Sequence, residues 1–190
     1  MIFEQAFLER GMEMAINFFI ATKSEEAPSG RFISVDGSVP GASVVYDHHK
    51  TGERINLDAM PETLSTEGFD GVGTTMMDAD AIVSAAVCAI GGIAAVPAQY
   101  VPVLRSASFW CDHLVGDPSQ DAQANQVGLG LMASMKNRGF AATKVIANQK
   151  YAGDVRQLTN SDISPVFAQL TTDLIEAIRA GSLCLATLPI

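Results

Sequence analysis

Cysteines are scarce in this sequence, and their spacing limits the kinds of site they could build. Only three of the 190 residues are cysteines, Cys88, Cys111 and Cys184, and no two of them form a Cys-x-x-Cys pair. Neither a structural zinc knuckle nor a disulfide framework is therefore supported. We expect the protein to work in a reducing, cytoplasmic setting.

Basic residues and long apolar runs are also scarce. The chain has 12 lysines and arginines against 21 aspartates and glutamates, which gives a net charge of −9. A protein this acidic lacks the basic surface that binds long nucleic acids, although a cleft that holds cations could still bind one phosphate group. No run of about 18 uncharged apolar residues occurs, so we expect no membrane span and no membrane partner. Self-association into a homo-oligomer is left open.

Hydrophobic residues, in contrast, are abundant. They make up 48% of the chain, enough to bury the core of a single domain over residues 1–190. Short apolar runs between turn residues predict strands, and longer periodic segments predict helices. The expected strands cover 15–22, 31–36, 43–47 and 71–77, with a strand-like run at 183–190. The expected helices cover 2–10, 78–90, 96–110, 119–139 and 164–181, and the third of them is expected to break near Pro102. A long loop is expected at 50–71.

Strands that alternate with helices predict the α/β class, a layered domain with a mostly parallel sheet flanked by helices. In such sheets, ligands bind beyond the carboxyl ends of the strands. Asp36, Asp47 and Asp78 each follow an expected strand. This shared position is the main structural indication of a functional site.

All three histidines of the chain stand within two residues of an aspartate. His48 and His49 follow Asp47 in "YDHHK", and His113 follows Asp112 in "CDHLVGD". If the strand continues through the first motif, Asp47 and His49 point to one face and His48 to the other. A carboxylate and an imidazole on one face are ligands for Mn²⁺, Fe or Zn²⁺. The alternative is ordinary loop chemistry and helix capping.

A second acidic motif, "DADAIVSAA", lies where a strand meets a helix. Asp78 and Asp80 are two residues apart, so both carboxylates can point into one crevice and bind a hard divalent cation. The same positions also suit a helix N-cap and an acidic first turn, which is a purely structural role.

Together these motifs resemble the DHH phosphoesterase superfamily. "DADAIVSA" is similar to its D-x-D motif, "FISVDGS" to its lone strand-end aspartate and "YDHH" to its Asp-His-His motif, and "CDHLVGD" stands where a further ligand is needed. The D-x-D motif here follows the other two, Thr74 replaces its upstream histidine, and no second substrate-binding domain is visible. The resemblance is therefore to a distant or circularly permuted relative.

The resemblance implies a phosphoesterase in which two divalent ions, most simply Mn²⁺, activate a water for attack on a small phosphorylated substrate. Asp36 would bridge the ions, and His48 would contact the phosphate. Arg54, shortly after the histidines, could bind a phosphate through two hydrogen bonds. The full set of expected metal ligands is Asp36, Asp47, His49, Asp78, Asp80, Asp112 and His113.

Two other functions remain open from the sequence. One is a non-catalytic α/β binding module, in which the Asp and His clusters are caps and turns. The other is a mononuclear enzyme of the metal amidohydrolase kind, with His48, His49 or His113 on one ion. The dinuclear hydrolase differs from the binding module in one respect, because it requires Asp36, His49, Asp78 and Asp80 to converge on one point.

Overall fold

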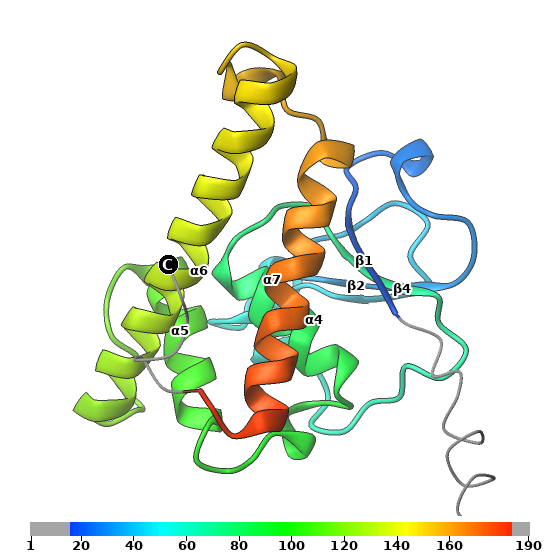
Figure 1. Ribbon diagram of the computed structural model, residues 1–190. Helices are drawn as coiled ribbons and strands as arrows, with labels where there is room; N and C mark the ends of the chain where they lie inside the picture. Colours follow the sequence, from blue (N-terminus) through cyan, green and yellow to red (C-terminus); the bar gives the residue numbers. More distant parts are fainter. Residues whose placement is uncertain (1–15, 184–190) are drawn as a thin grey trace, which may run out of the picture.

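The computed structural model describes residues 16–183, and these form an α/β fold built on one parallel sheet (Figure 1). The sheet has four strands in the order β1-β4-β2-β3, and every neighbouring pair is parallel. The predicted α/β class and parallel sheet are therefore confirmed. The strands are β1 (Asn17–Ile20), β2 (Phe32–Val35), β3 (Val44–Tyr46) and β4 (Gly71–Thr74).

Side chains alternate between the two faces of this sheet, as the period of a strand requires. Phe18 and Ile33 point into the main core, beneath the helices. Phe19 and Phe32 point to the opposite face, where they form a smaller core with Val39 from the loop that follows β2. Both faces of the sheet are thus covered, one by helices and the other by loops.

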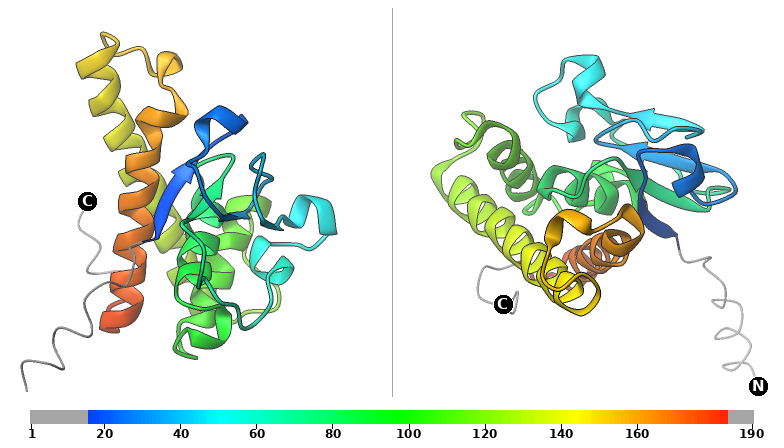
Figure 2. Two further views of the ribbon diagram at one scale, coloured as in Figure 1. Left: turned by 90° about the vertical axis from the view of Figure 1, so that its right-hand side faces the viewer. Right: turned by 90° about the horizontal axis from the view of Figure 1, so that it is seen from above.

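Four long helices lie on the main-core side of the sheet (Figure 2). α4 and α7 pack directly on the strands, and α5 and α6 pack against each other and against α4 and α7. The long helices are α4 (Ala79–Ala89), α5 (Val101–His113), α6 (Ala122–Lys150) and α7 (Asn160–Ala180). Shorter elements are α2 (His48–Thr51), α3 (Asn56–Ala59) and the 3-10 turns η1 (Ser24–Glu26), η2 (Ile93–Ala95) and η3 (Val155–Gln157).

The region after β3 differs from the prediction. The strand ends at Tyr46, and Asp47 caps the short helix α2, so the strand does not run through the histidines. The expected loop at 50–71 is also interrupted, because it contains the end of α2 and all of α3. This correction matters for the site, because a helical turn places neighbouring side chains on adjacent positions rather than on opposite faces.

Three helix boundaries also differ from the predictions. α5 begins at Val101 with Pro102 in its first turn, so the proline starts the helix rather than breaking it. α6 runs from Ala122 through Gly139 to Lys150, because one glycine costs only about 1 kcal/mol in a helix interior. α7 begins at Asn160, where Thr159 and Asp162 form a capping box, and it ends as predicted at Gly181. The helix expected at 2–10 and nearly all of the run at 183–190 lie outside the described residues.

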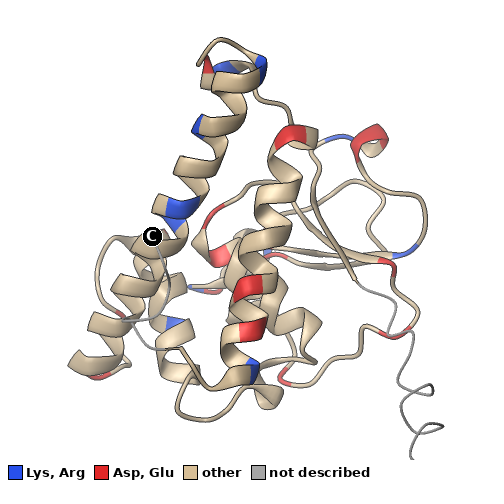
Figure 3. Cartoon of the chain, viewed as in Figure 1, with Lys and Arg blue, Asp and Glu red and all other residues tan. Residues whose placement is uncertain are grey.

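Charged residues are distributed unevenly over the fold (Figure 3). The basic ones are scattered and form no continuous stripe, in line with the net charge of −9. α6 differs from the acidic rest of the chain, because residues 122–150 contain four basic residues and no aspartate or glutamate. In the part of the chain that the structure covers, no helix combines the length and the apolar character needed to cross a membrane.

Candidate metal centre

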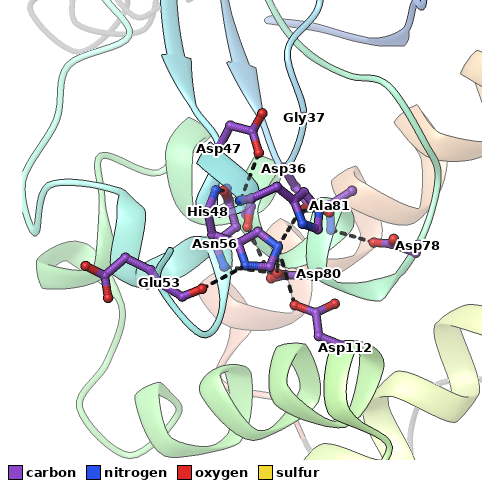
Figure 4. A network of polar contacts seen from close by, with 12 residues as sticks. Asp36, Gly37, Asp47, His48, Glu53, Asn56, Asp78, Asp80, Ala81 and Asp112 are labelled. Atoms are coloured by element: carbon purple, nitrogen blue, oxygen red, sulfur yellow. Dashed lines mark hydrogen bonds and ion pairs between the residues drawn. The ribbon is translucent and has the colours of Figure 1, made fainter. Parts of the chain in front are cut away.

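Five Asp and His side chains converge beyond the carboxyl end of the sheet (Figure 4). The Nε2 atom of His48 lies 3.2 Å from Oδ1 of Asp36, 3.5 Å from Oδ2 of Asp112 and 3.8 Å from Oδ2 of Asp80. His49 joins from the side, with its Nε2 atom 3.6 Å from Oδ1 of Asp36. The sequence predicted ligands beyond the carboxyl ends of the strands, and these residues meet there.

Asp36 occupies the centre of this cluster and has an unusual backbone. It follows β2 directly and has φ 47, in the left-handed region that few non-glycine residues adopt. The Thr74 hydroxyl donates a hydrogen bond of 3.1 Å to the Asp36 carbonyl oxygen, which links the ends of β2 and β4. Strained backbone of this kind gathers at functional sites, because the surrounding structure must hold it in place.

Asp47 shapes the centre without joining it. One of its carboxylate oxygens accepts the His49 backbone N–H at 3.1 Å, and the other accepts the Ser38 hydroxyl at 2.7 Å. One oxygen thus caps α2 and the other is held by Ser38, and Asp47 belongs to neither of the two groups that could hold an ion. Its role is to start the turn that carries His48 and His49.

The two histidines point to the same place, with ring centroids 4.0 Å apart. His48 is buried, and its Nδ1 lies 3.3 Å from the carbonyl oxygen of Glu53. An Nδ1–H that donates to this carbonyl leaves the lone pair of Nε2 directed at the carboxylates, which is the usual orientation of a metal-binding histidine. His49 is 65% exposed in its side chain and borders the opening of the site.

The two aspartates of the D-x-D motif have different roles. Asp78 is the N-cap of α4 and accepts the Ala81 N–H at 2.9 Å, so the capping role foreseen for it is present. Its carboxyl group also contacts that of Asp36. Asp80, in the first turn of the helix, has no exposed surface and points into the cluster. The spacing of two residues therefore places one carboxylate at the rim and one in the interior.

Asn56 supports the centre, although the sequence patterns do not identify it. It is fully buried at the start of α3, where its side-chain oxygen accepts the His48 N–H at 3.1 Å. Its own backbone N–H donates to Oδ2 of Asp80 at 3.0 Å. One residue thus fixes a histidine and a carboxylate of the cluster relative to each other. No local motif marks it, because its two partners lie 8 and 24 residues away.

The electrostatics of the cluster are strongly unfavourable without a cation. Burial, together with the nearby carboxylates of Asp80, Asp78 and Asp112, raises the pKa of Asp36 to about 9. Burial and the charge of Asp80 raise the pKa of Asp112 to about 8. Burial also raises the pKa of Asp78. Among residues 16–183, no lysine or arginine forms an ion pair with these carboxylates.

Three buried polar atoms in the cluster have no hydrogen-bond partner: Oδ1 of Asp36, Nε2 of His48 and Oδ2 of Asp112. Buried polar atoms are satisfied in nearly all native structures, so each exception requires an explanation. These three atoms face one another across the same small space. Their geometry and chemistry fit a bound divalent cation, which carboxylate oxygens and an imidazole nitrogen would ligate.

Two residues expected in the site lie beside it. Nε2 of His113 is 2.8 Å from the carbonyl oxygen of Arg54, and its ring stacks on Phe109 with a centroid distance of 4.1 Å. The Arg54 guanidinium also lies over the Phe109 ring, with its Cζ atom 4.5 Å from the ring centroid. The structure thus uses His113 and Arg54 to join the loop after α2 to α5, and His113 is in neither ligand group.

The chain matches no protein-family model, no curated protein and no solved structure. Its function therefore has to be inferred from the geometry and chemistry of the cluster itself.

Proposed function

We propose that this protein is a divalent-metal-dependent hydrolase of the phosphoesterase kind, in which a metal-activated water attacks a small phosphorylated substrate. The observation that carries the proposal is the meeting of three unpartnered buried ligand atoms, from Asp36, His48 and Asp112. Among residues 16–183, no lysine or arginine forms an ion pair with these groups. A binding module gains nothing from this arrangement, since buried like charges destabilise the fold that contains them.

The cluster has room for two overlapping sets of ligands. His48, Asp80 and Asp112 form one group, and Asp36, His48 and His49 form the other. The single lone pair of His48 Nε2 serves one ion only. We therefore assign His48 to the ion near Asp80 and Asp112. A second ion would use Asp36 and Asp78, whose carboxyl groups are in contact. The sequence led us to expect that His48 would contact the phosphate. In this proposal His48 is a metal ligand, and the exposed His49 contacts the phosphate.

A divalent cation held there would lower the pKa of a bound water and neutralise the charge on a phosphoryl group. The residues of the chain supply the remaining requirements. Asp47 and Asn56 fix the direction of the two imidazoles, and the tight turn at Asp36 fixes the central carboxylate. The exposed ring of His49 lies where it can donate a proton to a phosphate or to a departing oxygen.

The chemistry of the ligands favours a hard ion such as Mn²⁺ over a structural zinc. Carboxylates outnumber imidazoles, and hard divalent cations prefer oxygen ligands. The two cysteines among residues 16–183 are neutral thiols, because burial raises the pKa of both Cys88 and Cys111 to about 12. The resemblance of the motifs to DHH phosphoesterases supports the same choice of ion and reaction.

The proposal is tested by hydrolysis of a panel of phosphomonoesters and short phosphodiesters, with and without Mn²⁺. We expect turnover that depends on Mn²⁺ and falls by about a hundredfold or more in Asp36→Asn, because the neutral amide cannot hold the cation. Asp47→Asn is the matched control. Asparagine keeps the helix cap, and Asp47 ligates nothing in the proposal, so this variant should keep most of its activity. Equal activity of wild type and Asp36→Asn would refute the proposal.

A further inference from the structure

A pocket of about 250 Å³ opens directly beside the candidate metal centre. The beginning of α4, the end of α5, the middle of α6 and Leu170 of α7 enclose it. Asp78 belongs to both places, because it lines this pocket while its carboxyl group contacts Asp36. Cys111, another lining residue, directly precedes Asp112 on α5. We call this cavity the side pocket.

The walls of the side pocket suit a flat apolar group. Met77, Met132 and Met135 line it together with Trp110, whose indole N–H is fixed by a hydrogen bond of 3.0 Å to the Asn125 carbonyl oxygen. Methionines adapt their shape to a ligand and make favourable contacts with aromatic rings. An apolar cavity of about 150 Å³ is already large enough to bind benzene. The side pocket therefore has the size and chemistry for one ring system.

The rim of the side pocket has features that are costly in a protein without a ligand there. Phe140 is 64% exposed and Leu114 is 76% exposed, although both are large apolar residues. Exposed apolar surface that rims a pocket is typical of ligand-binding sites.

The rim also carries one positive charge. Lys136 lines the side pocket from α6, and among residues 16–183 it forms no ion pair. An unpaired lysine is notable in a chain with a net charge of −9. Combined with the apolar walls, it suits a ligand that joins an anionic group to a compact apolar one.

We propose that the side pocket binds an aromatic or similarly compact apolar group of the substrate, while the phosphate of the same molecule lies at the metal centre and is attracted by Lys136. This inference rests on the proposed phosphoesterase function and names its substrate class: phosphate esters of alcohols that carry one ring. In the reaction, the oxygen of a water molecule bonds to phosphorus, the bond from phosphorus to the ester oxygen breaks, and the alcohol leaves with a proton from that water.

The test compares benzyl phosphate with methyl phosphate in the presence of Mn²⁺. Both are alkyl esters with similar leaving groups, so a difference between them reports binding of the ring. We expect kcat/KM to be about 10- to 100-fold higher for benzyl phosphate, the range that a well-filled apolar pocket provides. Trp110 is the single tryptophan of the chain, so its fluorescence emission reports occupation of the side pocket independently of turnover.

Two variants and two matched controls lie on the same helix. Phe140→Ala should raise KM for benzyl phosphate by about 3- to 10-fold and leave methyl phosphate unchanged, because it removes an aromatic contact from the rim. Lys136→Gln should weaken the binding of both esters. Val145→Ala and Lys144→Gln change an apolar and a charged residue of α6 outside the side pocket, and they should behave like wild type.

The outcomes separate this inference from the proposed function. A saturable change in Trp110 emission with benzyl but not methyl phosphate, weakened in Phe140→Ala and not in Val145→Ala, supports the side pocket even if neither ester is hydrolysed. In that case only the proposed reaction fails. Equal responses to the two esters, or a response to benzyl phosphate that Phe140→Ala leaves intact, would overturn the inference.

Discussion

At the scale of one residue, Asp112 is where the proposed metal binding and the stability of the fold would oppose each other. Its carboxylate faces Asp80 and Asp36 around His48, and its pKa is raised to about 8 by burial and by the charge of Asp80. Such an arrangement costs stability in the absence of a cation and provides affinity in its presence. The two effects can be separated by a substitution that removes the charge and keeps the shape.

We predict that Asp112→Asn stabilises the metal-free protein and weakens metal binding. At about pH 9, where the Asp112 carboxyl group has lost its proton, removal of one like charge should add about 1 kcal/mol, which corresponds to a rise in Tm of about 2–4 °C for a chain of this size. Affinity for Mn²⁺ should fall more than about tenfold, because a ligand is lost. Thermal unfolding with and without Mn²⁺ measures both effects. A lower Tm of the metal-free variant, with unchanged response to Mn²⁺, would show that Asp112 has only a structural role.

The raised pKa values also predict how stability depends on pH. Asp36 and Asp112 have folded-state pKa values of about 9 and about 8, above the value of about 3.9 in an unfolded chain. The folded state binds these protons more tightly, so the stabilisation is complete below about pH 4 and is lost as pH rises through the folded-state values. The Tm of the metal-free protein should therefore fall between about pH 5 and about pH 8.5.

A divalent cation should oppose this fall, because it takes the place of the bound protons. The check is a series of thermal unfolding curves across this pH range, recorded with chelator and with excess divalent cation. Asp36→Asn removes the group whose pKa is raised most. Without metal, the Tm of this variant should therefore depend less on pH than the Tm of wild type. A Tm that rises with pH in the presence of chelator would contradict the assignment of these groups.

The residues of the site were predictable from sequence only where a motif marks them. Asp36, Asp80 and Asp112 could be named because each stands in a recognisable pattern next to an expected strand or histidine. The orientation of His48 and His49 could not, because it depends on whether the chain continues as a strand or turns into a helix after Tyr46. Asn56 carries no signal at all, since its role arises from contacts that only the folded chain creates.

At the scale of elements, the position of α5 decides whether Asp112 reaches the cluster. α5 packs closely on α6, and Gly128 makes this approach possible. A Cβ atom at Gly128 would lie 2.6 Å from Cβ of Ser106 and 2.8 Å from the backbone nitrogen of Ala107, both on α5. Backbone cannot yield as a flexible side chain does, so any larger residue must push the two helices apart.

We therefore predict that Gly128→Ala destabilises the protein by about 1–3 kcal/mol, although alanine is intrinsically the better helix former. Denaturant unfolding measures the change in the free energy of unfolding. Gln126→Ala, an exposed position on the same helix, serves as the control and should be close to neutral. A Gly128→Ala variant as stable as wild type would mean that the α5–α6 contact is not as tight as described.

The strands and the existence of the later helices were predictable, whereas several helix boundaries were not. Short apolar runs identify β1 and β2, because both faces of each strand are buried, one towards each core. The end of α6 was misplaced because Gly139 resembles a stop signal. In the structure this glycine is buried, and a Cβ there would lie 3.3 Å from Met77 and 3.5 Å from Leu170. Tertiary packing, which the local sequence does not reveal, explains its presence inside the helix.

At the scale of the whole molecule, the net charge bears on the kind of substrate that we propose. The net charge is −9, and the basic residues are scattered except on α6 (Figure 3). Long nucleic acids need several basic contacts along their backbone, and each contact contributes to affinity. A small phosphate ester needs only the cation-filled cleft and one or two nearby donors.

We predict that the protein does not bind duplex DNA, even at low ionic strength, where non-specific electrostatic binding is strongest. A band-shift assay with a short labelled duplex at about 20 mM salt, with and without Mn²⁺, tests this prediction. Turnover of the small phosphate esters should proceed in the same buffer. Tight binding of the duplex would show that the substrate is a polyanion and would contradict the substrate class proposed above.

The central claim is that Asp36, His48, Asp80 and Asp112 hold a divalent cation, with a second ion at Asp36 and Asp78. Metal content, measured by mass spectrometry after dialysis against Mn²⁺, tests it most directly in wild type, Asp36→Asn and Asp47→Asn. We predict about two ions per chain in wild type and in Asp47→Asn, and almost none in Asp36→Asn, because its carboxylate would serve both ions. Wild-type protein that retains no Mn²⁺, or an Asp36→Asn variant that retains as much as wild type, would contradict the claim.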